Sequence, residues 1–560
     1  MAKSIFGLFN TDAKDDPLAS VTTVAEWAAT LPTNDPVAAA TSMVHLLEGM
    51  CAAKPALTLE RTLALMELDR LSLPLQAQLQ TQHRTAALSE DVRQDLWLGR
   101  NDLTRWLAYA YERIYDGTTS QPVDGWLRGH LHGVFSRMFH YRARQAQLGF
   151  LRYEQWIPAR WKFLHAAYKV ASGQGVSSLP FSLNPNSQPT DRFSVEQEYL
   201  WLLLLQRINS GNLSVPQIEL ASQWARELVP SLQLTRTPPK SGPYWLLDLA
   251  STEGLTTAPL ELPEGDLLFL DIAPMRVHLN ALTETLGKQL GPDSEITGRA
   301  ETRARLALIK RLEVLLLPNA KPQPRRGERR SEQKAVLVAS SWAEIPVLMR
   351  QSHPWKKHEP LKYTYDGLAG PAGVTAAEVP TTSITVNDSL FPEQRGWQVL
   401  DVSESGCRIE SRTRQASQLL VGGLLVVLFE GETRRRVGIV RRLKRRTADH
   451  TEIGVEIITE NAVLVRPEPI AADGEALNTS GSDKGGAFHA LYVPPQERQR
   501  LTPVRSVFVP AAEFLPNGHY SMDVDGQTNR IRLVLIIEQT KDWVWSTFEA
   551  VGAWRERPRV

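Results

Sequence analysis

The pattern of apolar and polar positions changes character near residue 320. Before it, apolar residues recur with helical spacing, as in the stripe of Leu306, Ile309 and Leu312. Residues three and four apart share one face of a helix, so these stripes predict amphipathic helices. The expected helices cover 126–148, 153–170, 196–207 and 303–317, and another begins after Asn101, an expected N-cap. Short connections between them favour a helical array or bundle.

Beyond residue 330 the apolar residues alternate with polar ones or form short valine-rich runs. This pattern predicts strands at 335–339, 397–402, 406–411, 424–429, 435–443 and 451–459. Several short strands in close succession indicate a small barrel or sandwich. Asp525-Gly526 predicts one more hairpin, in a tail that is either a separate small β domain or an extension of the barrel.

The expected fold class is therefore α+β and multidomain, with a mostly helical N-terminal half, a small antiparallel β-barrel and a further β segment. Proline and charge gather at 318–330, and a polar stretch rich in glycine and serine covers 472–486. Such segments are typical of linkers. We expect a helical domain at 1–318, a barrel at 319–470 with an insertion near 350–395, a flexible linker at 471–486 and a β-rich segment at 487–560.

Composition limits the function classes. The 63 basic and 62 acidic residues give a formal charge of +1, so binding to nucleic acid would need a local patch and is not expected of the whole chain. The two cysteines, Cys51 and Cys407, are too few for a disulfide framework and fit a reducing compartment. The apolar runs are shorter than the ~20 residues that span a bilayer. We expect a cytoplasmic protein without a membrane span and without a metal or redox cofactor.

Two motifs carry candidate binding chemistry. Residues 325–330 contain Arg325, Arg326, Arg329 and Arg330, and residues 401–406 contain Asp401, Ser403 and Gly406. A guanidinium can hold a phosphate with two parallel hydrogen bonds and can stack on a purine. A carboxylate can accept hydrogen bonds from the guanine N1–H and amine, and a glycine permits close backbone approach. A phosphodiester with guanine bases would use all of these groups, whereas either motif alone is more often a solvated tether or a capped turn.

Together and in this order, the motifs resemble those of the PilZ family of cyclic di-GMP receptors, which carries Arg-x-x-x-Arg before Asp/Asn-x-Ser-x-x-Gly. The first motif fits Arg325 with Arg329, or Arg326 with Arg330; the second is met in full. The resemblance covers about residues 320–470 and implies that the arginines hold phosphates and guanine edges while Asp401 and Ser403 hold a guanine. It implies a bacterial effector or adaptor, not an enzyme, that couples cyclic di-GMP binding to a protein partner through the helical half. Residues 1–318 show no family motif.

Other interpretations of the sequence remain open. The basic run 434–446 is either a solvated strand edge, which we favour, or a nucleic acid patch. A nucleic-acid-binding β module, or a degenerate PilZ scaffold that binds a protein without ligand, is the alternative function. His130, His132 and His140 do not share one helical face, which favours structural or surface roles over a metal site. An unrecognised enzyme in the helical half is a third hypothesis.

Overall fold

The structure is a computed structural model. It describes residues 16–53, 58–84, 88–120, 125–184, 188, 192–259, 261–290, 296–318, 328–351, 396–412, 416, 418–447, 450–471, 486–495, 504–524 and 526–552. Over these residues the chain divides into two compact units, with the boundary between 323 and 324 and with residues 211–214 belonging to the second unit. The expected insertion and the expected 471–486 linker fall almost entirely outside the described residues, and the four domain bounds stay a prediction.

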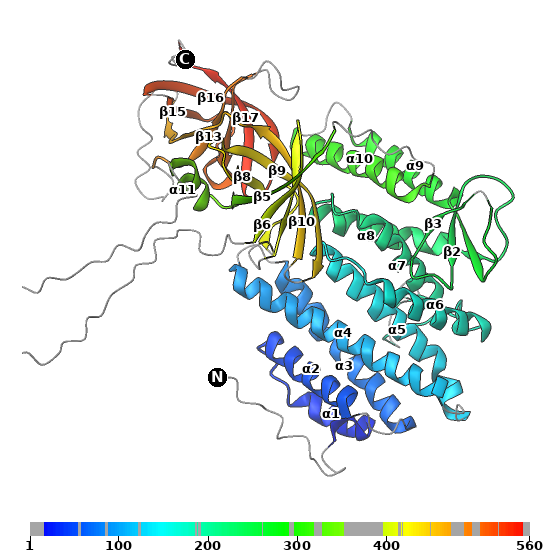
Figure 1. Ribbon diagram of the computed structural model, residues 1–560. Helices are drawn as coiled ribbons and strands as arrows, with labels where there is room; N and C mark the ends of the chain where they lie inside the picture. Colours follow the sequence, from blue (N-terminus) through cyan, green and yellow to red (C-terminus); the bar gives the residue numbers. More distant parts are fainter. Residues whose placement is uncertain are drawn as a thin grey trace, which may run out of the picture. The chain divides into compact units, whose positions relative to one another are not determined.

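The first unit consists mainly of helices, coloured blue to green in Figure 1. They are α1 (Val21–Ala29), α2 (Pro36–Ala53), α3 (Leu59–His83), α4 (Glu90–Ser120), α5 (Gly125–Leu151), α6 (Pro158–Gly173), α7 (Val195–Ile208), α8 (Val215–Leu228), α9 (Ala273–Lys288) and α10 (Ile296–Leu316), with short 3₁₀ turns at Pro17–Ala19 and Val229–Ser231. The helical stripes in the sequence are thus confirmed as helices.

Two expected helix starts are wrong. Asn101 lies inside α4, which begins eleven residues earlier at Glu90, because the helix already has a start signal in Ser89, whose hydroxyl accepts the Val92 N–H at 3.4 Å. The helix expected from Tyr153 begins instead at Pro158. Tyr153 has a φ of +63°, a left-handed conformation that no helix continues through, and the proline supplies the first turn.

Helix α7 lies at the centre of this unit. Its residues from Tyr199 to Leu205 are all buried, so the helix is apolar around its whole circumference. Ser194 and Gln197 form a capping box that fixes its first turn.

A buried polar network connects helices α3, α4 and α5. Asp69 of α3 accepts hydrogen bonds from Tyr111 of α4 and Tyr141 of α5 and pairs with Arg137 of α5 at 3.0 Å. This network ties three helices together through one satisfied carboxylate.

A small antiparallel sheet is inserted between α8 and α9. Its strands are β1 (Leu234–Thr235), β2 (Tyr244–Asp248), β3 (Thr256–Thr257) and β4 (Leu267–Asp271), in the order β1-β4-β2-β3.

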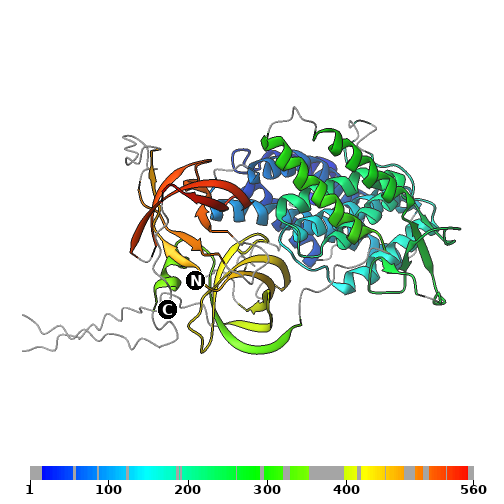
Figure 2. The ribbon, with the colours of Figure 1, turned by 90° about the horizontal axis from the view of Figure 1, so that it is seen from above.

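The second unit begins with a closed six-stranded antiparallel barrel in the order β10-β7-β6-β5-β8-β9, seen from above in Figure 2. Its strands are β5 (Arg330–Ala339), β6 (Trp397–Ser403), β7 (Gly406–Ser411), β8 (Leu424–Phe429), β9 (Arg436–Thr447) and β10 (His450–Thr459), with helix α11 (Glu344–Arg350) after β5. Val399, Ile409 and Ile453 are among the buried residues that alternate with outward polar ones. The expected strands and the α+β fold class are confirmed, although β5 starts five residues earlier than predicted.

The tail forms a seven-stranded sheet in the order β11-β13-β14-β17-β16-β15-β12. These strands are β11 (Val463–Val465), β12 (Glu468–Ile470), β13 (Ala490–Val493), β14 (Ser506–Pro510), β15 (His519–Val524), β16 (Gln527–Gln539) and β17 (Trp543–Ala550), with a 3₁₀ turn at Ala511–Glu513. One buried cluster contains both barrel residues, such as Leu428, and sheet residues, such as Phe508 and Trp545. The sheet therefore packs on the barrel within one unit.

Within the described residues, no helix combines the length and the apolar character needed to cross a bilayer.

Candidate functional site

The Asp-x-Ser-x-x-Gly sequence forms the β6–β7 hairpin. β6 ends at Ser403 and β7 begins at Gly406, which leaves a two-residue turn, Glu404 and Ser405. The Ser403 hydroxyl donates to the Gly406 carbonyl oxygen at 3.1 Å and closes the turn. The Ser405 carbonyl oxygen accepts the Ile457 N–H of β10 at 3.0 Å. The motif is thus part of the barrel wall, fixed to the next strand.

The Asp401 carboxylate joins this hairpin to the start of β5. Asp401 is 8% exposed. Arg329 Nη1 lies 3.0 Å from Oδ1, and Arg408 Nε lies 2.8 Å from Oδ2. Each carboxylate oxygen therefore has its own guanidinium, while the two arginine side chains remain 55% and 44% exposed. Two cations on one anion leave a local excess of positive charge that faces solvent, which suits an anionic ligand.

Strand pairing brings the two motifs together across a long stretch of sequence. Arg330 pairs with Val402 and Ser331 with Asp401 in the β5–β6 register. Arg329 directly precedes this pairing and reaches the Asp401 carboxylate. The long separation between the motifs, residues 352–395 of which lie outside the described residues, does not prevent their contact.

The predicted site residues divide into three groups. Arg329, Asp401, Ser403 and Gly406 lie on the β6–β7 hairpin or directly beside it. Arg330 begins β5 and is exposed. Arg325 and Arg326 lie outside the described residues.

A row of residues continues from Asp401 around the outside of the barrel. Asp401 pairs with Arg408, Arg408 with Gly454 of β10, and Gly454 with Arg442 of β9. Directly opposite residues in neighbouring antiparallel strands project from the same face. Arg408 and Arg442 are both exposed, and the glycine between them has no side chain. The row therefore places two exposed arginines on either side of a glycine on the outer face of the barrel.

Arg408 is the site residue that the sequence analysis missed, although the sequence carried a signal for it. In a hairpin with a two-residue turn, residues at equal distance from the turn face each other. Asp401 lies three residues before Glu404, and Arg408 lies three residues after Ser405, so the two face each other across the hairpin. Placing the turn at Glu404–Ser405 would have predicted the ion pair.

Several charges of the basic run 434–446 are paired within the second unit. Arg436 pairs with Glu432 and Glu460, and Arg446 pairs with Glu452 at 2.6 Å. Arg441 binds Glu538 through both terminal nitrogens. Charges bound in this way are less available to a polyanion, so the run is a weaker nucleic acid patch than its composition suggests.

Neither Cys407 nor the candidate histidines extend the site. Cys407 faces the barrel interior, and burial raises the pKa of its thiol to about 12, so it stays protonated. His132 Nε2 lies 3.1 Å from the Leu179 carbonyl oxygen, whereas His140 Nδ1 lies 2.9 Å from Glu198 Oε1. These two histidines thus have separate hydrogen-bond partners.

Fold and site together define a multidomain α+β protein with an arginine–carboxylate site on the outside of a small β-barrel. Residues 22–240 match the family model described as "Cyclic-di-GMP receptor FimW, N-terminal domain". The match runs from α1 to just past β1, so the helical half, which showed no family motif in the sequence analysis, is similar to a domain of a cyclic di-GMP receptor. No curated protein and no solved structure matches the chain significantly.

Proposed function

We propose that this protein is a non-enzymatic cytoplasmic receptor for cyclic di-GMP, which it binds at the Asp401 site of a PilZ-like barrel. Two independent observations support the proposal. The helical half is similar to the N-terminal domain of a cyclic di-GMP receptor. The barrel, outside that match, holds Arg329 and Arg408 on the single carboxylate of Asp401. This second observation carries the location of the site.

The proposed binding step is an exchange of partners at Asp401. Without ligand, the carboxylate accepts Arg329 and Arg408. A guanine offers N1–H and an amine to the same oxygens, so it replaces at least one guanidinium there. The released arginine then meets the phosphodiester, with which it forms a charge-assisted pair. Arg329 holds Asp401 before binding, so the register of Arg325 with Arg329 is the one we favour.

Binding at this position also suggests how the ligand could affect the rest of the protein. Arg329 is the last residue of the connection between α10 and β5, which covers residues 317–329. A ligand that draws Arg329 away from Asp401 acts on the last residues of this connection. We propose that the change is read by a protein partner of the helical half, as an ordering event at a junction.

Calorimetric titration of the full chain with cyclic di-GMP tests this function, with GTP and cyclic di-AMP as competitors. Asp401→Ala and Arg329→Ala are expected to weaken binding by roughly 10- to 100-fold, the effect of losing a hydrogen bond to a charged group. Arg434→Gln is the matched control, because this arginine, two residues before β9, is 76% exposed and pairs with Glu460 only at 3.7 Å.

Wild-type protein that is folded but does not bind cyclic di-GMP would overturn the proposal and favour the degenerate scaffold. Binding to nucleic acid that weakens steeply with salt and survives Asp401→Ala would favour the basic β module instead.

A further inference from the structure

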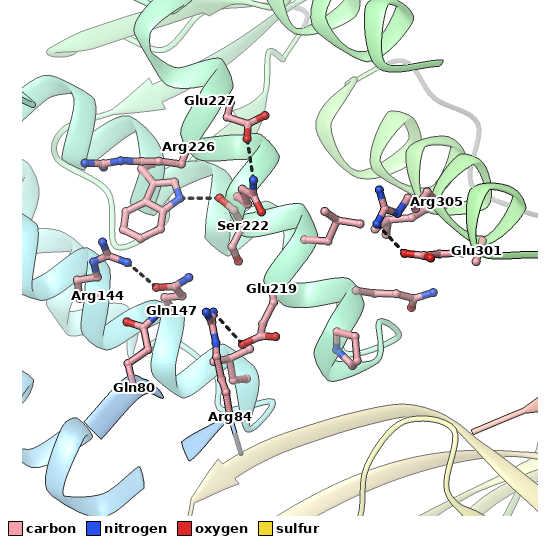
Figure 3. A pocket seen from close by; sticks show the side chains of 18 of the residues that line it. Gln80, Arg84, Arg144, Gln147, Glu219, Ser222, Arg226, Glu227, Glu301 and Arg305 are labelled. Atoms are coloured by element: carbon pink, nitrogen blue, oxygen red, sulfur yellow. Dashed lines mark hydrogen bonds and ion pairs between the residues drawn. The ribbon is translucent and has the colours of Figure 1, made fainter. Parts of the chain in front are cut away.

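A cavity of about 650 Å³ lies among the helices of the first unit. Its walls come from α4, α5, α7, α8 and α10 and from the end of α3, and Figure 3 shows most of the lining side chains. This volume lies within the range of about 300–1,000 Å³ that is typical of small-ligand sites. It exceeds what a lone inorganic anion would fill.

Arginines dominate the polar lining of this cavity. Five of them, Arg84, Arg100, Arg144, Arg226 and Arg305, face three glutamates, Glu219, Glu227 and Glu301. The lining itself has an excess of two positive charges, and one of these is balanced by Glu198, the buried partner of Arg226 outside the lining. Because buried charges in proteins are normally paired, such an excess in a concave site points to an anion.

Two of these arginines have neutral amides as their hydrogen-bond partners. Arg100 Nη2 donates to Gln80 Oε1 and Arg144 Nη1 donates to Gln147 Oε1, each at 3.2 Å. Burial, together with the nearby guanidiniums of Arg144 and Arg84, lowers the pKa of Arg100 to about 10. The group stays charged at neutral pH but is repelled by its neighbours. An anion between Arg100 and Arg144 would relieve this repulsion.

Contacts around Trp201 hold two of the lining arginines, Arg144 and Arg226, in place. The Trp201 indole N–H donates to the Ser222 carbonyl oxygen at 3.1 Å. The guanidiniums of Arg144 and Arg226 lie over its ring, 5.1 and 4.8 Å from the centroid. Arg226 is fixed in turn by the buried Glu198 at 2.7 Å. These contacts place the arginines before any ligand arrives, which lowers the entropy cost of binding.

We propose that this cavity binds a small phosphorylated ligand of the nucleotide class. Arg100 and Arg144 would hold its phosphate, with Arg84 at the exposed rim. The amides of Gln80 and Gln147 and the apolar side chains of Leu220 and Leu308 would accommodate the heterocycle. The site is separate from the Asp401 site and would bind a second ligand, or a second copy of the same one.

The test uses the full-length chain carrying Asp401→Ala, so that the barrel site is silenced. Calorimetry with GMP, cyclic di-GMP, guanosine and inorganic phosphate covers the ligand class. At least one of the two nucleotides, GMP or cyclic di-GMP, is expected to bind, and guanosine is not.

Variants in the same Asp401→Ala chain then test the arginines of the cavity. Replacing both Arg100 and Arg144 by glutamine should weaken nucleotide binding by roughly 10- to 100-fold. Adding Arg84→Gln, whose side chain is 61% exposed, should weaken it without a risk to folding. Arg105→Gln, on the same helix as Arg100 but paired with Asp102 outside the cavity, is the control.

Hydrogen exchange locates the ligand independently of these variants. The nucleotide should protect backbone amides at 80–84, 144–151 and 216–227. The proposal fails if neither nucleotide binds the Asp401→Ala chain, if binding persists in the arginine variants, or if protection appears elsewhere. Phosphate that binds as tightly as the nucleotides would overturn the nucleotide class. Loss of all binding on Asp401→Ala refutes the cavity site alone and leaves the proposed function standing.

Discussion

Gly406 of β7 lies against the backbone of Val455 in β10, so closely that a Cβ atom at residue 406 would be 2.4 Å from the Val455 carbonyl oxygen. The obstacle is backbone and cannot rotate away. Gly406→Ala should therefore separate the two strands locally and destabilise the second unit by about 1–3 kcal/mol, the usual range for overpacking. The hairpin that holds Asp401 would shift with it.

Hydrogen exchange of the amides at 401–411 measures this effect, and it should be faster in Gly406→Ala than in the wild type. Gly486→Ala is the control within the same unit, because nothing lies within 4 Å of a Cβ at that position. Equal exchange in the two variants would show that β7 tolerates a side chain there.

Asp401→Ala should separate binding from stability. Its two ion pairs involve arginines that are about half exposed, and such pairs contribute roughly 0–1 kcal/mol. The thermal unfolding of the variant should therefore stay close to that of the wild type, while cyclic di-GMP affinity falls by the tenfold or more stated above. A large drop in unfolding temperature would instead assign Asp401 a structural role.

The arginine register can be decided by single variants. Arg329 contacts Asp401, whereas Arg330 begins β5 opposite Val402. Arg329→Ala should weaken cyclic di-GMP binding by roughly 10- to 100-fold, and Arg330→Ala by much less. Titration calorimetry compares the variants. Arg325→Ala should lose about as much cyclic di-GMP affinity as Arg329→Ala, and Arg326→Ala about as little as Arg330→Ala. The reverse order would select the other register.

The sequence predicted the barrel strands well because they either alternate between buried and exposed positions, as Cys407, Arg408 and Ile409 do, or form a short apolar run that is buried throughout, as β8 does. It predicted helix starts less well. Asn101 is a good N-cap residue, but it does not start a new helix because it lies within a longer helix, α4, whose apolar stripe continues on both sides of it. Propensity near Asn101 was overridden by packing along α4.

The cavity of the first unit could not be predicted from the sequence. Its arginines come from α4, α5, α8 and α10 and from the end of α3, and they are separated by up to about two hundred residues. Along any one helix, Arg100 or Arg144 is an ordinary polar position between apolar ones. Only the packing of the helices brings these charges to one space.

The ion pair of the buried Glu198 with the partly exposed Arg226 should make the stability of the helical unit depend on pH. Burial alone would raise the pKa of Glu198, but Arg226 at 2.7 Å and the hydrogen-bonded His140 outweigh it and hold that pKa below its usual value of 4.5. A lowered pKa in the folded state gives stabilisation that is complete above pH 4.5 and is lost as the pH falls through the folded-state pKa. Acid should therefore loosen α5, α7 and α8 first.

Glu198→Gln tests this dependence. It removes the charge that pairs with Arg226, and because the Arg226 side chain is 32% exposed to solvent, the cost at pH 7 should be about 1–3 kcal/mol. The variant should also lose much of the change between pH 5 and pH 3, measured by hydrogen exchange within 195–228. Glu227→Gln on α8, whose carboxylate accepts a hydrogen bond from Gln223, is the control. A variant with the full wild-type pH dependence would show that other groups control it.

Arg441 should couple the barrel to the seven-stranded sheet. Its Nη1 and Nη2 bind the two Glu538 oxygens of β16 at 2.6 and 2.7 Å, and its Nε binds Glu456 of β10 at 2.7 Å. Glu456 is also the β10 residue that pairs with Gly406, so Arg441 connects the sheet to the strand beside the Asp401 hairpin. The two acidic side chains outweigh burial and raise the pKa of Arg441, which stays charged.

A double-mutant cycle of Arg441→Gln and Glu538→Gln measures the coupling. Because both side chains are about one-third exposed, we expect an interaction of about 0.5–1 kcal/mol, visible as faster hydrogen exchange in β16 for either single variant and little further change in the double one. If the sheet responds to ligand, cyclic di-GMP should slow exchange in β16 of the wild type but not of Arg441→Gln. Additive effects of the two substitutions would mean that the apolar core shared by Phe508 and Leu428 holds the sheet to the barrel without help from this ion pair.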